Sequence, residues 1–215
     1  MDNIWNAIPL DDYEQHMQHE TVGQLQLLSK LTGKYLKKIK PRTAMFLGIS
    51  GGNGLEHIDI NITNQVFGID INKKYLHETN ERFNKDIPNL NLINLDISST
   101  PKKIASVNLI WAALIFEYVE TQKCFEFINH NIQNNGFLIV TIQANNGVPS
   151  VSQTGIETIK LVGKIFKLVD PNDLLSVADK FGFKKIDFEE NILPNNKSLK
   201  TYTFLKTDNK LPTIL

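Results

Sequence analysis

The 215-residue sequence contains a single cysteine, Cys124, and carries no formal net charge. One cysteine excludes an internal disulfide and a metal site built from several cysteines. Lys plus Arg and Asp plus Glu both number 23, which argues against a general nucleic-acid-binding protein, because such proteins carry a basic excess. No apolar run approaches the roughly 20 residues of a membrane-spanning helix, and no signal-peptide pattern is present. We therefore expect a cytoplasmic protein with neither nucleic-acid nor membrane partners.

Short apolar segments alternate with amphipathic ones from residue 41 onward. They predict strands at 44–49, 65–70, 90–96, 107–116 and 137–143, and helices at 72–86 and 123–133. Strands that are apolar throughout belong to sheets covered on both faces, and their alternation with helices indicates parallel βαβ units. A third helix from Pro171 to Gly182 precedes two alternating segments, 183–191 and 199–207, that predict an antiparallel hairpin. We expect a doubly wound α/β sheet of seven strands, mostly parallel.

A loop of small residues, Gly48 to Gly54, follows the first predicted strand and leads into what reads as a helix. The sequence of this loop matches neither of the common nucleotide-binding patterns. A G-x-G-x-x-G loop would need glycine at His57, and a P-loop would end in Gly-Lys-Ser/Thr. The sequence of the loop alone therefore does not identify its ligand.

Acidic residues end the next two strands, at Asp70 and Asp96. Both lie at the carboxyl edge of the predicted sheet, where doubly wound proteins bind ligands. A carboxylate at the second strand end can accept charge-assisted hydrogen bonds from ribose hydroxyls. The second acid can accept one from an adenine amino group, and Ile71 and Ile97 can flank a flat base.

Taken in order, these segments resemble the motifs of class I S-adenosylmethionine-dependent methyltransferases. The matching segments are FLGISGGNG for the first motif, VFGIDIN for the second, NLDIS for the third, VNLIWAALIFEYV for the fourth and IQNNGFLIVTIQ for the fifth strand. The C-terminal helix and hairpin resemble those of the family as well. The resemblance implies a Rossmann-like fold, S-adenosyl-L-methionine as cofactor, S-adenosyl-L-homocysteine as product, and methyl transfer by in-line displacement.

The first motif departs from the family pattern. Gly48 stands where the family has an acid, and Ser50 stands where it has its first glycine. Serine fits the position of Ser50 if its φ is negative. Loss of the acid should weaken cofactor binding unless another acceptor replaces it, and the candidates are Glu14 and the backbone at the fourth strand end. By resemblance, the cofactor-binding residues are Gly48, Ser50, Gly51, Gly52, Asn53, Asp70, Ile71, Asp96, Ile97 and Ala113.

Two segments outside the motifs are candidates for the acceptor site, residues 1–20 and 144–170. Tyr13, His16 and Met17 share one helical face and are predicted to form a lid over the methyl-transfer site. Glu117 and Tyr118 follow the fourth strand, where family members place side chains beside the transferred methyl. Glu117 and His16 are thus candidate catalytic residues, and Tyr13, Met17 and Tyr118 candidate substrate-binding residues, although packing or solvent exposure would also explain each of them.

We divide the single domain, residues 1–215, into a helical lid (1–40), a cofactor-binding core (41–143), a substrate-side insertion (144–170) and a C-terminal helix and hairpin (171–215). Neutral charge and the absence of an Asn/Asp-Pro-Pro-aromatic signature after the fourth strand favour a small-molecule acceptor. We expect no metal, and either a monomer or a homodimer. Two alternatives stay open: a non-catalytic protein that binds an adenosyl cofactor, and a nicotinamide-dependent dehydrogenase.

Overall fold

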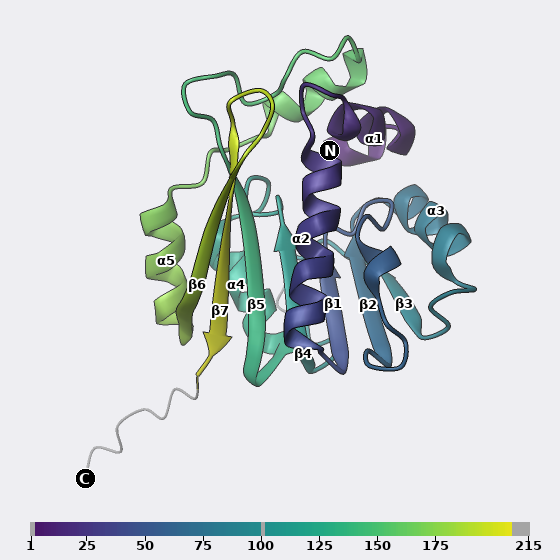
Figure 1. The fold of residues 1–215 in the computed structure, drawn as a ribbon, viewed down its shortest axis with the longest axis vertical. Coiled ribbons are helices and arrows are strands. Elements are labelled where there is room, and N and C mark those ends of the chain that lie inside the picture. The colour runs from purple at the N-terminus through teal and green to yellow at the C-terminus, as the bar shows by residue number, and fades with distance from the viewer. Residues whose placement is uncertain (1–2, 100–101, 208–215) are drawn as a thin grey trace.

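One seven-stranded sheet organises the computed structural model, which describes residues 3–99 and 102–207 (Figure 1). The strand order is β3-β2-β1-β4-β5-β7-β6. Neighbours from β3 to β5 run parallel, and β7 pairs antiparallel with both β5 and β6. This confirms the predicted sheet and its hairpin. The strands are β1 (Thr43–Leu47), β2 (Gln65–Asp70), β3 (Leu90–Asn94), β4 (Val107–Ala113), β5 (Ile132–Ala144), β6 (Phe183–Ile192) and β7 (Ser198–Lys206).

Five α-helices and three 3₁₀ segments accompany the sheet. Their starts follow from local hydrogen bonding: Asn72 caps α3 by accepting from the Lys74 N–H, and Asp170 caps α5, which has Pro171 in its first turn. None of the helices in the described ranges has the length and apolar character that crossing a bilayer requires. The helical segments are η1 (Ile4–Ala7), α1 (Leu10–Gln18), α2 (Gln24–Ile39), η2 (Leu55–His57), α3 (Lys73–Phe83), α4 (Thr121–Asn131), η3 (Glu157–Lys164) and α5 (Pro171–Lys180).

The two faces of the sheet bury separate cores. Along β1, Met45 and Leu47 point into the core covered by α4 and α5, whereas Ala44 and Phe46 point into the core covered by α2 and α3. Successive strand side chains alternate between faces, so a strand that is apolar at every position supplies both cores. The sheet edge formed by the carboxyl ends of the parallel strands then stays free for a ligand.

The helix expected after the glycine loop is absent, and this prediction is wrong. The chain forms only the short segment η2 before a polar turn leads to β2. Helix α2, which precedes β1, covers this part of the sheet instead (Figure 1). The contact is close, because a Cβ on Gly33 of α2 would lie 2.9 Å from the His57 ring, and one on Gly54 would lie 2.7 Å from Thr32. With α2 in place, there is no room for a second helix.

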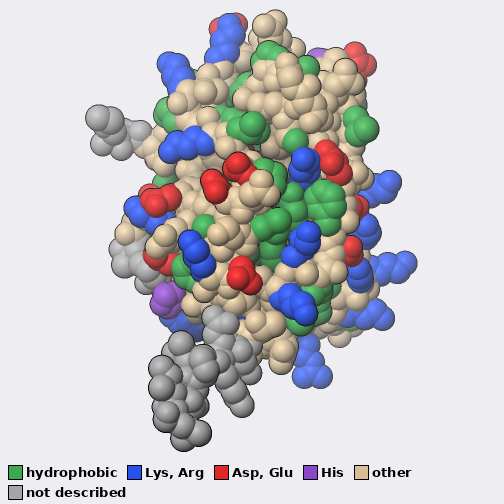
Figure 2. All heavy atoms as spheres, turned by 90° about the vertical axis from the view of Figure 1, so that its left-hand side faces the viewer, with side chains coloured by type: hydrophobic (Ala, Val, Ile, Leu, Met, Phe, Trp, Pro, Cys, Tyr) green, Lys and Arg blue, Asp and Glu red, His purple; other side chains and the backbone are tan. Residues whose placement is uncertain are grey.

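Helix α2 also reaches the far edge of the sheet. Its basic residues Lys34 and Lys38 pair with Glu189 and Asp187 of β6, at 2.6 and 2.8 Å. Figure 2 shows this side of the molecule, where hydrophobic side chains lie among basic and acidic ones. Edge strand β6 exposes Ile186 together with Phe188 and Ile192, and interspersed charges of this kind discourage edge-to-edge pairing.

We predict that Phe125→Ala destabilises the fold by about 3–5 kcal/mol, as large-to-small core changes do. The Phe125 side chain is fully buried on α4, with ring centroids 5.3 to 6.0 Å from those of Phe116, Phe181 and Phe183. Urea unfolding measures the loss. Ile192→Ala is the matched control, because its side chain is 79% exposed and should change stability by less than about 0.5 kcal/mol. Equal effects of the two substitutions would contradict the assignment of the core.

Candidate functional site

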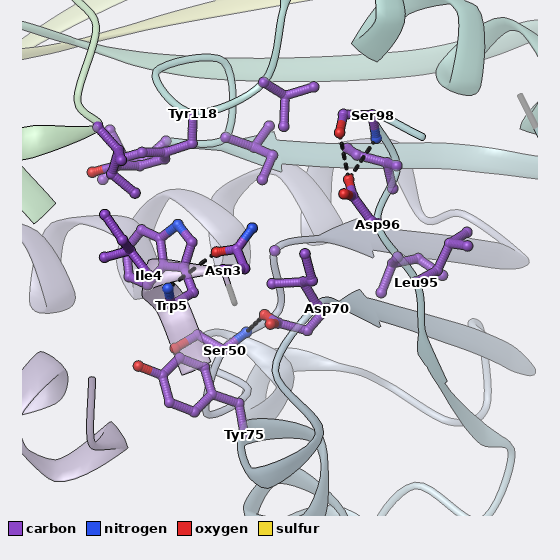
Figure 3. A pocket seen from close by; sticks show the side chains of 18 of the residues that line it. Asn3, Ile4, Trp5, Ser50, Asp70, Tyr75, Leu95, Asp96, Ser98 and Tyr118 are labelled. Carbon is purple, nitrogen blue, oxygen red and sulfur yellow. Dashed lines mark hydrogen bonds between the residues drawn. The ribbon is translucent and has the colours of Figure 1, made fainter. Parts of the chain in front are cut away.

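A cavity of about 380 Å³ lies at the carboxyl edge of the parallel strands (Figure 3). We call it the main cavity. Each of the first four strands contributes to it through its end or the following loop, and the N-terminal segment closes the opposite side. Its lining includes Gly48, Ser50, Asp70, Ile71, Asp96, Ile97, Ala113, Leu114 and Ile115 from the strand ends, and Asn3, Ile4, Trp5, Tyr13, Tyr75 and Tyr118 from other elements.

The Asp70 carboxylate is one of two carboxylates that line the main cavity. Its Oδ2 accepts the Ser50 N–H at 2.9 Å, and its Oδ1 accepts the Asn72 N–H at 2.8 Å. Burial raises the pKa of Asp70, while these backbone hydrogen bonds act to lower it. Each oxygen of a carboxylate can accept more than one hydrogen bond. Asp70 therefore has capacity for two further donors from a ligand.

Asp96 lies across the same cavity from Asp70 (Figure 3). Its Oδ1 accepts both the Ser98 N–H and the Ser98 hydroxyl, at 2.8 and 2.6 Å, which holds the side chain in place after β3. Ile71 and Ile97 line the same cavity and supply apolar surface. The structure thus brings together the four residues that sequence reasoning had assigned to a nucleoside.

The glycine loop has a different conformation from the one expected. Ser50 has a φ of +52°, so the condition of a negative φ is not met, and the residue occupies the left-handed region that favours glycine. Its hydroxyl is buried and has no hydrogen-bond partner within the described residues. The backbone N–H of Ser50 is committed to Asp70. We attribute the strained φ to this bond, which pulls the loop toward β2.

Gly51, Gly52 and Asn53 do not line the main cavity. Together with other loop residues, Gly51 and Asn53 border a smaller space of about 60 Å³, which we call the loop cavity. A Cβ on Gly52 would lie 2.6 Å from the Phe83 ring, so this glycine is required for packing against α3. The glycines thus shape the turn, and only Gly48 and Ser50 reach the main cavity.

The Glu14 side chain extends from α1 to the glycine loop, whose motif lacks the family's acid. Its carboxylate makes a two-pronged pair with Arg82, at 2.5 and 3.0 Å, and Arg82 also donates to the Gly51 carbonyl at 3.2 Å. Glu14 lines the loop cavity beside Gly51. A carboxylate is thus present at the glycine loop, but it comes from the N-terminal segment.

The N-terminal segment covers the main cavity and is tied to the core on the β2 side. Asn72 donates to the Trp5 carbonyl and the Tyr75 hydroxyl donates to the Ile8 carbonyl, both at 2.9 Å. Trp5 contacts Tyr13 and Tyr118 edge to face, with centroid separations of 5.6 and 5.0 Å. Trp5 and Tyr75 had not been assigned to the site from the sequence. The only signal for Trp5 was an aromatic residue in an otherwise polar segment.

A third space, of about 40 Å³, lies on the other side of Tyr13 and Tyr118. We call it the lysine cavity, after Lys197. His16 and Met17 line it and do not line the main cavity. The His16 Nδ1 pairs with the Thr154 hydroxyl at 2.8 Å, and burial lowers the pKa of His16 to about 4. His16 is therefore neutral at physiological pH.

Glu117 does not border the main cavity, and its role as a candidate catalytic residue stays a prediction from the sequence. Its side chain is fully buried and lines none of these three cavities. One oxygen accepts the Gln143 N–H at 2.7 Å, and burial raises the pKa of Glu117 to about 7. Leu114, three residues earlier, has a φ of +53° and ends β4. The chain changes direction at Leu114. Tyr118 then faces the main cavity, and Glu117 faces the protein interior.

Part of the chain is similar in sequence to a known family of domains. Residues 46–140 match the family model described as a methyltransferase domain. No curated protein is similar enough in sequence to match the chain. The matched region covers the glycine loop, both acidic strand ends and β4, and it runs into β5.

Solved structures extend the similarity to the whole chain. The N-methyltransferase NodS from Bradyrhizobium japonicum WM9 in complex with S-adenosyl-l-homocysteine has a TM-score of 0.67 at 10% identity, covering 96% of this chain and 100% of that one. Magnesium protoporphyrin IX methyltransferase (ChlM) from Synechocystis PCC 6803 with bound SAM gives 0.67 at 11%, with 94% and 93% covered. Geranyl diphosphate C-methyltransferase from Streptomyces coelicolor A3(2) gives 0.64 at 11%, with 90% and 87% covered. The similarity establishes a Rossmann-like methyltransferase fold.

We predict that Glu117 makes stability fall as pH rises through its titration range. The ordinary pKa of 4.5 applies to the unfolded chain and the raised pKa of about 7 to the folded protein. The unfolded state therefore loses its proton first, and stability decreases between about pH 4.5 and 7 by up to about 1.4 kcal/mol per pH unit. Glu117→Gln removes this contribution, so its stability relative to the parent protein should rise across that range and level off above pH 7.

Urea unfolding of both proteins from pH 4 to 8 measures the difference. His16, whose pKa is shifted downward, contributes in the opposite sense but is present in both proteins and cancels. Parallel stability curves would show that Glu117 ionises normally.

Proposed function

Because the chain carries a methyltransferase domain and the Rossmann-like fold of S-adenosylmethionine-dependent methyltransferases, we propose that it transfers a methyl group from S-adenosylmethionine to a small-molecule acceptor. The observation that carries this proposal is the Asp70 carboxylate, buried at the end of β2 with capacity for two more hydrogen bonds. That is the acceptor set a ribose diol needs. Neighbours of the same fold are methyltransferases crystallised with the homocysteine product or the intact cofactor.

The chemistry of the site fits such a cofactor. Asp70 would accept from the ribose hydroxyls, and Asp96 from the adenine amino group, with Ile71 and Ile97 on the faces of the base. The partnerless Ser50 hydroxyl borders both the main cavity and the loop cavity. There it is available to the amino-acid end, near the Glu14 carboxylate that takes the place of the family acid. The ribose hydroxyls, the adenine amino group and the amino-acid end thus each have a candidate partner.

We infer that methyl transfer takes place near Tyr13 and Leu114, the two side chains that border the main, loop and lysine cavities alike. The sulfonium cofactor supplies an activated methyl group. This chain's residues align the acceptor with it and exclude water, and such positioning can supply several kcal/mol of the barrier. The aromatic cluster of Trp5, Tyr13 and Tyr118 closes this position from solvent.

The two candidate bases are poorly suited to proton removal. Glu117 lies away from the cavities, and His16, with a pKa near 4, is a weak base that is better suited to orienting an acceptor. We therefore infer an acceptor atom that already carries a free lone pair or loses its proton to water. The methyltransferase-domain match does not favour the dehydrogenase alternative. A small-molecule acceptor, a cytoplasmic location and a monomeric or homodimeric state remain predictions from the sequence.

We expect Asp70→Asn to weaken S-adenosylhomocysteine binding by about 2–4 kcal/mol, because charge-assisted hydrogen bonds contribute about 1.5–3 kcal/mol each. Isothermal titration calorimetry of the folded variant measures this. Asp187→Asn on exposed β6 is the control and should bind like the parent protein. Affinity of the Asp70 variant within twofold of the parent would rule out the assigned ribose contact. Binding of NADH in preference to S-adenosylhomocysteine would revive the dehydrogenase.

We also expect Arg82→Met to release S-adenosylhomocysteine faster than the parent protein. The substitution removes both bonds to Glu14 and the bond to the Gly51 carbonyl, which join α1 to the glycine loop. Partly exposed pairs contribute at most about 1 kcal/mol, so global stability should change little. Stopped-flow displacement measures the dissociation rate, with Arg42→Met at an exposed position as control. An unchanged dissociation rate would mean that the Arg82–Glu14 pair does not hold the N-terminal segment over the main cavity.

A further inference from the structure

The lysine cavity contains a buried cation that the proposed cofactor site does not use. Lys197, in the turn between β6 and β7, is only 2% exposed. Its Nζ donates to the Ser150 carbonyl at 2.6 Å and to the Ser152 hydroxyl at 3.0 Å. No Asp or Glu in the described ranges lies within ion-pair distance of it. Burial lowers the pKa of Lys197 to about 8, so the amine is still mostly charged at neutral pH.

The other polar groups around the cavity do not supply a negative charge. Gln24 donates to the Gln143 side-chain oxygen at 2.7 Å, and the Gln143 amide donates onward to the Ser150 carbonyl at 2.9 Å. His16 is neutral and uses only its Nδ1, with Thr154. Burying a cation without an opposite charge is unfavourable. The built site therefore has one uncompensated positive charge and, at Lys197, a third N–H beyond the two it donates to Ser150 and Ser152.

The volume of the lysine cavity, and the residues it shares with the main cavity, define which group could compensate the charge of Lys197. Its volume of about 40 Å³ suits a group of a few atoms and excludes a whole acceptor. Tyr13, Leu114 and Tyr118 border both this cavity and the main cavity, so a molecule anchored at Lys197 extends toward the methyl-transfer position. Tyr118 and Phe166, with centroids 6.0 Å apart, give that path aromatic walls.

We propose that the methyl acceptor is a small aromatic carboxylate whose carboxylate pairs with Lys197, an inference that rests on the proposed methyl transfer. One carboxylate balances one ammonium, whereas a phosphate dianion would leave a buried excess of negative charge. The aromatic walls favour a flat ring between the carboxylate and the reacting atom. The polar residues around Lys197 come from α1, the 144–170 insertion and the β6–β7 turn, which lie outside the region matched by the methyltransferase model, whereas Leu114 and Tyr118 lie within it.

The test uses benzoate and phenylacetate as probes, each paired with its neutral amide, benzamide or phenylacetamide. Calorimetry on protein saturated with S-adenosylhomocysteine should give carboxylate affinities at least tenfold above those of the amides. Lys197→Met should weaken carboxylate binding at least tenfold and leave S-adenosylhomocysteine binding unchanged. Lys184→Met, at an exposed position of β6, should bind both probes like the parent protein.

Equal binding of amides and carboxylates to the parent protein would overturn the proposal, and so would undiminished benzoate binding by Lys197→Met or no carboxylate binding at all. Should Lys197→Met fail to fold by circular dichroism, the carboxylate–amide comparison on the parent protein decides by itself. Failure of S-adenosylhomocysteine to bind would instead refute the proposed function. The same carboxylate series on the ligand-free protein would then test the lysine site separately.

Discussion

The Asp70 carboxylate joins two loops that the rest of the site depends on. By accepting the Ser50 N–H and the Asn72 N–H, it fixes the turn after β1 against the start of α3. Asn72 in turn holds the Trp5 carbonyl, so the N-terminal cover is positioned through the same link. The energetic cost is visible in the left-handed φ of Ser50 and in the upward shift of the Asp70 pKa. A ligand that donates to this carboxylate would stabilise its charged form.

Much of the fold could be predicted from the sequence, because its signals are local. Uniformly apolar strands, the proline at the start of the C-terminal helix and the alternating C-terminal segments each reflect short-range chemistry. The acids at the ends of β2 and β3 could be located for the same reason: parallel strands in a doubly wound sheet all point their carboxyl ends to one edge. The placement of Asp70 and Asp96 at one edge of the sheet follows from that rule.

The parts that could not be predicted depend on contacts between distant segments. Nothing near His57 in the sequence indicates that α2 would occupy the place of a crossover helix. Ser50 takes its left-handed φ because of Asp70, twenty residues away. Glu117 and Tyr118 are adjacent, and only the reversal at Leu114 decides which of them faces the cavity. The polar residues around Lys197 come from three segments, α1, 144–170 and the β6–β7 turn, and no sequence motif links these segments.

Helix α2 has a consequence for the order of events during synthesis. The helix emerges from the ribosome early, yet Lys34 and Tyr35 bond to Glu189, about 150 residues later in the chain. Contacts of such separation must wait until the hairpin exists, since closing long loops delays non-local pairing. Until β6 and β7 arrive, α2 has only the strands of the nascent sheet to cover. The last strands to be made therefore complete the docking of one of the first helices.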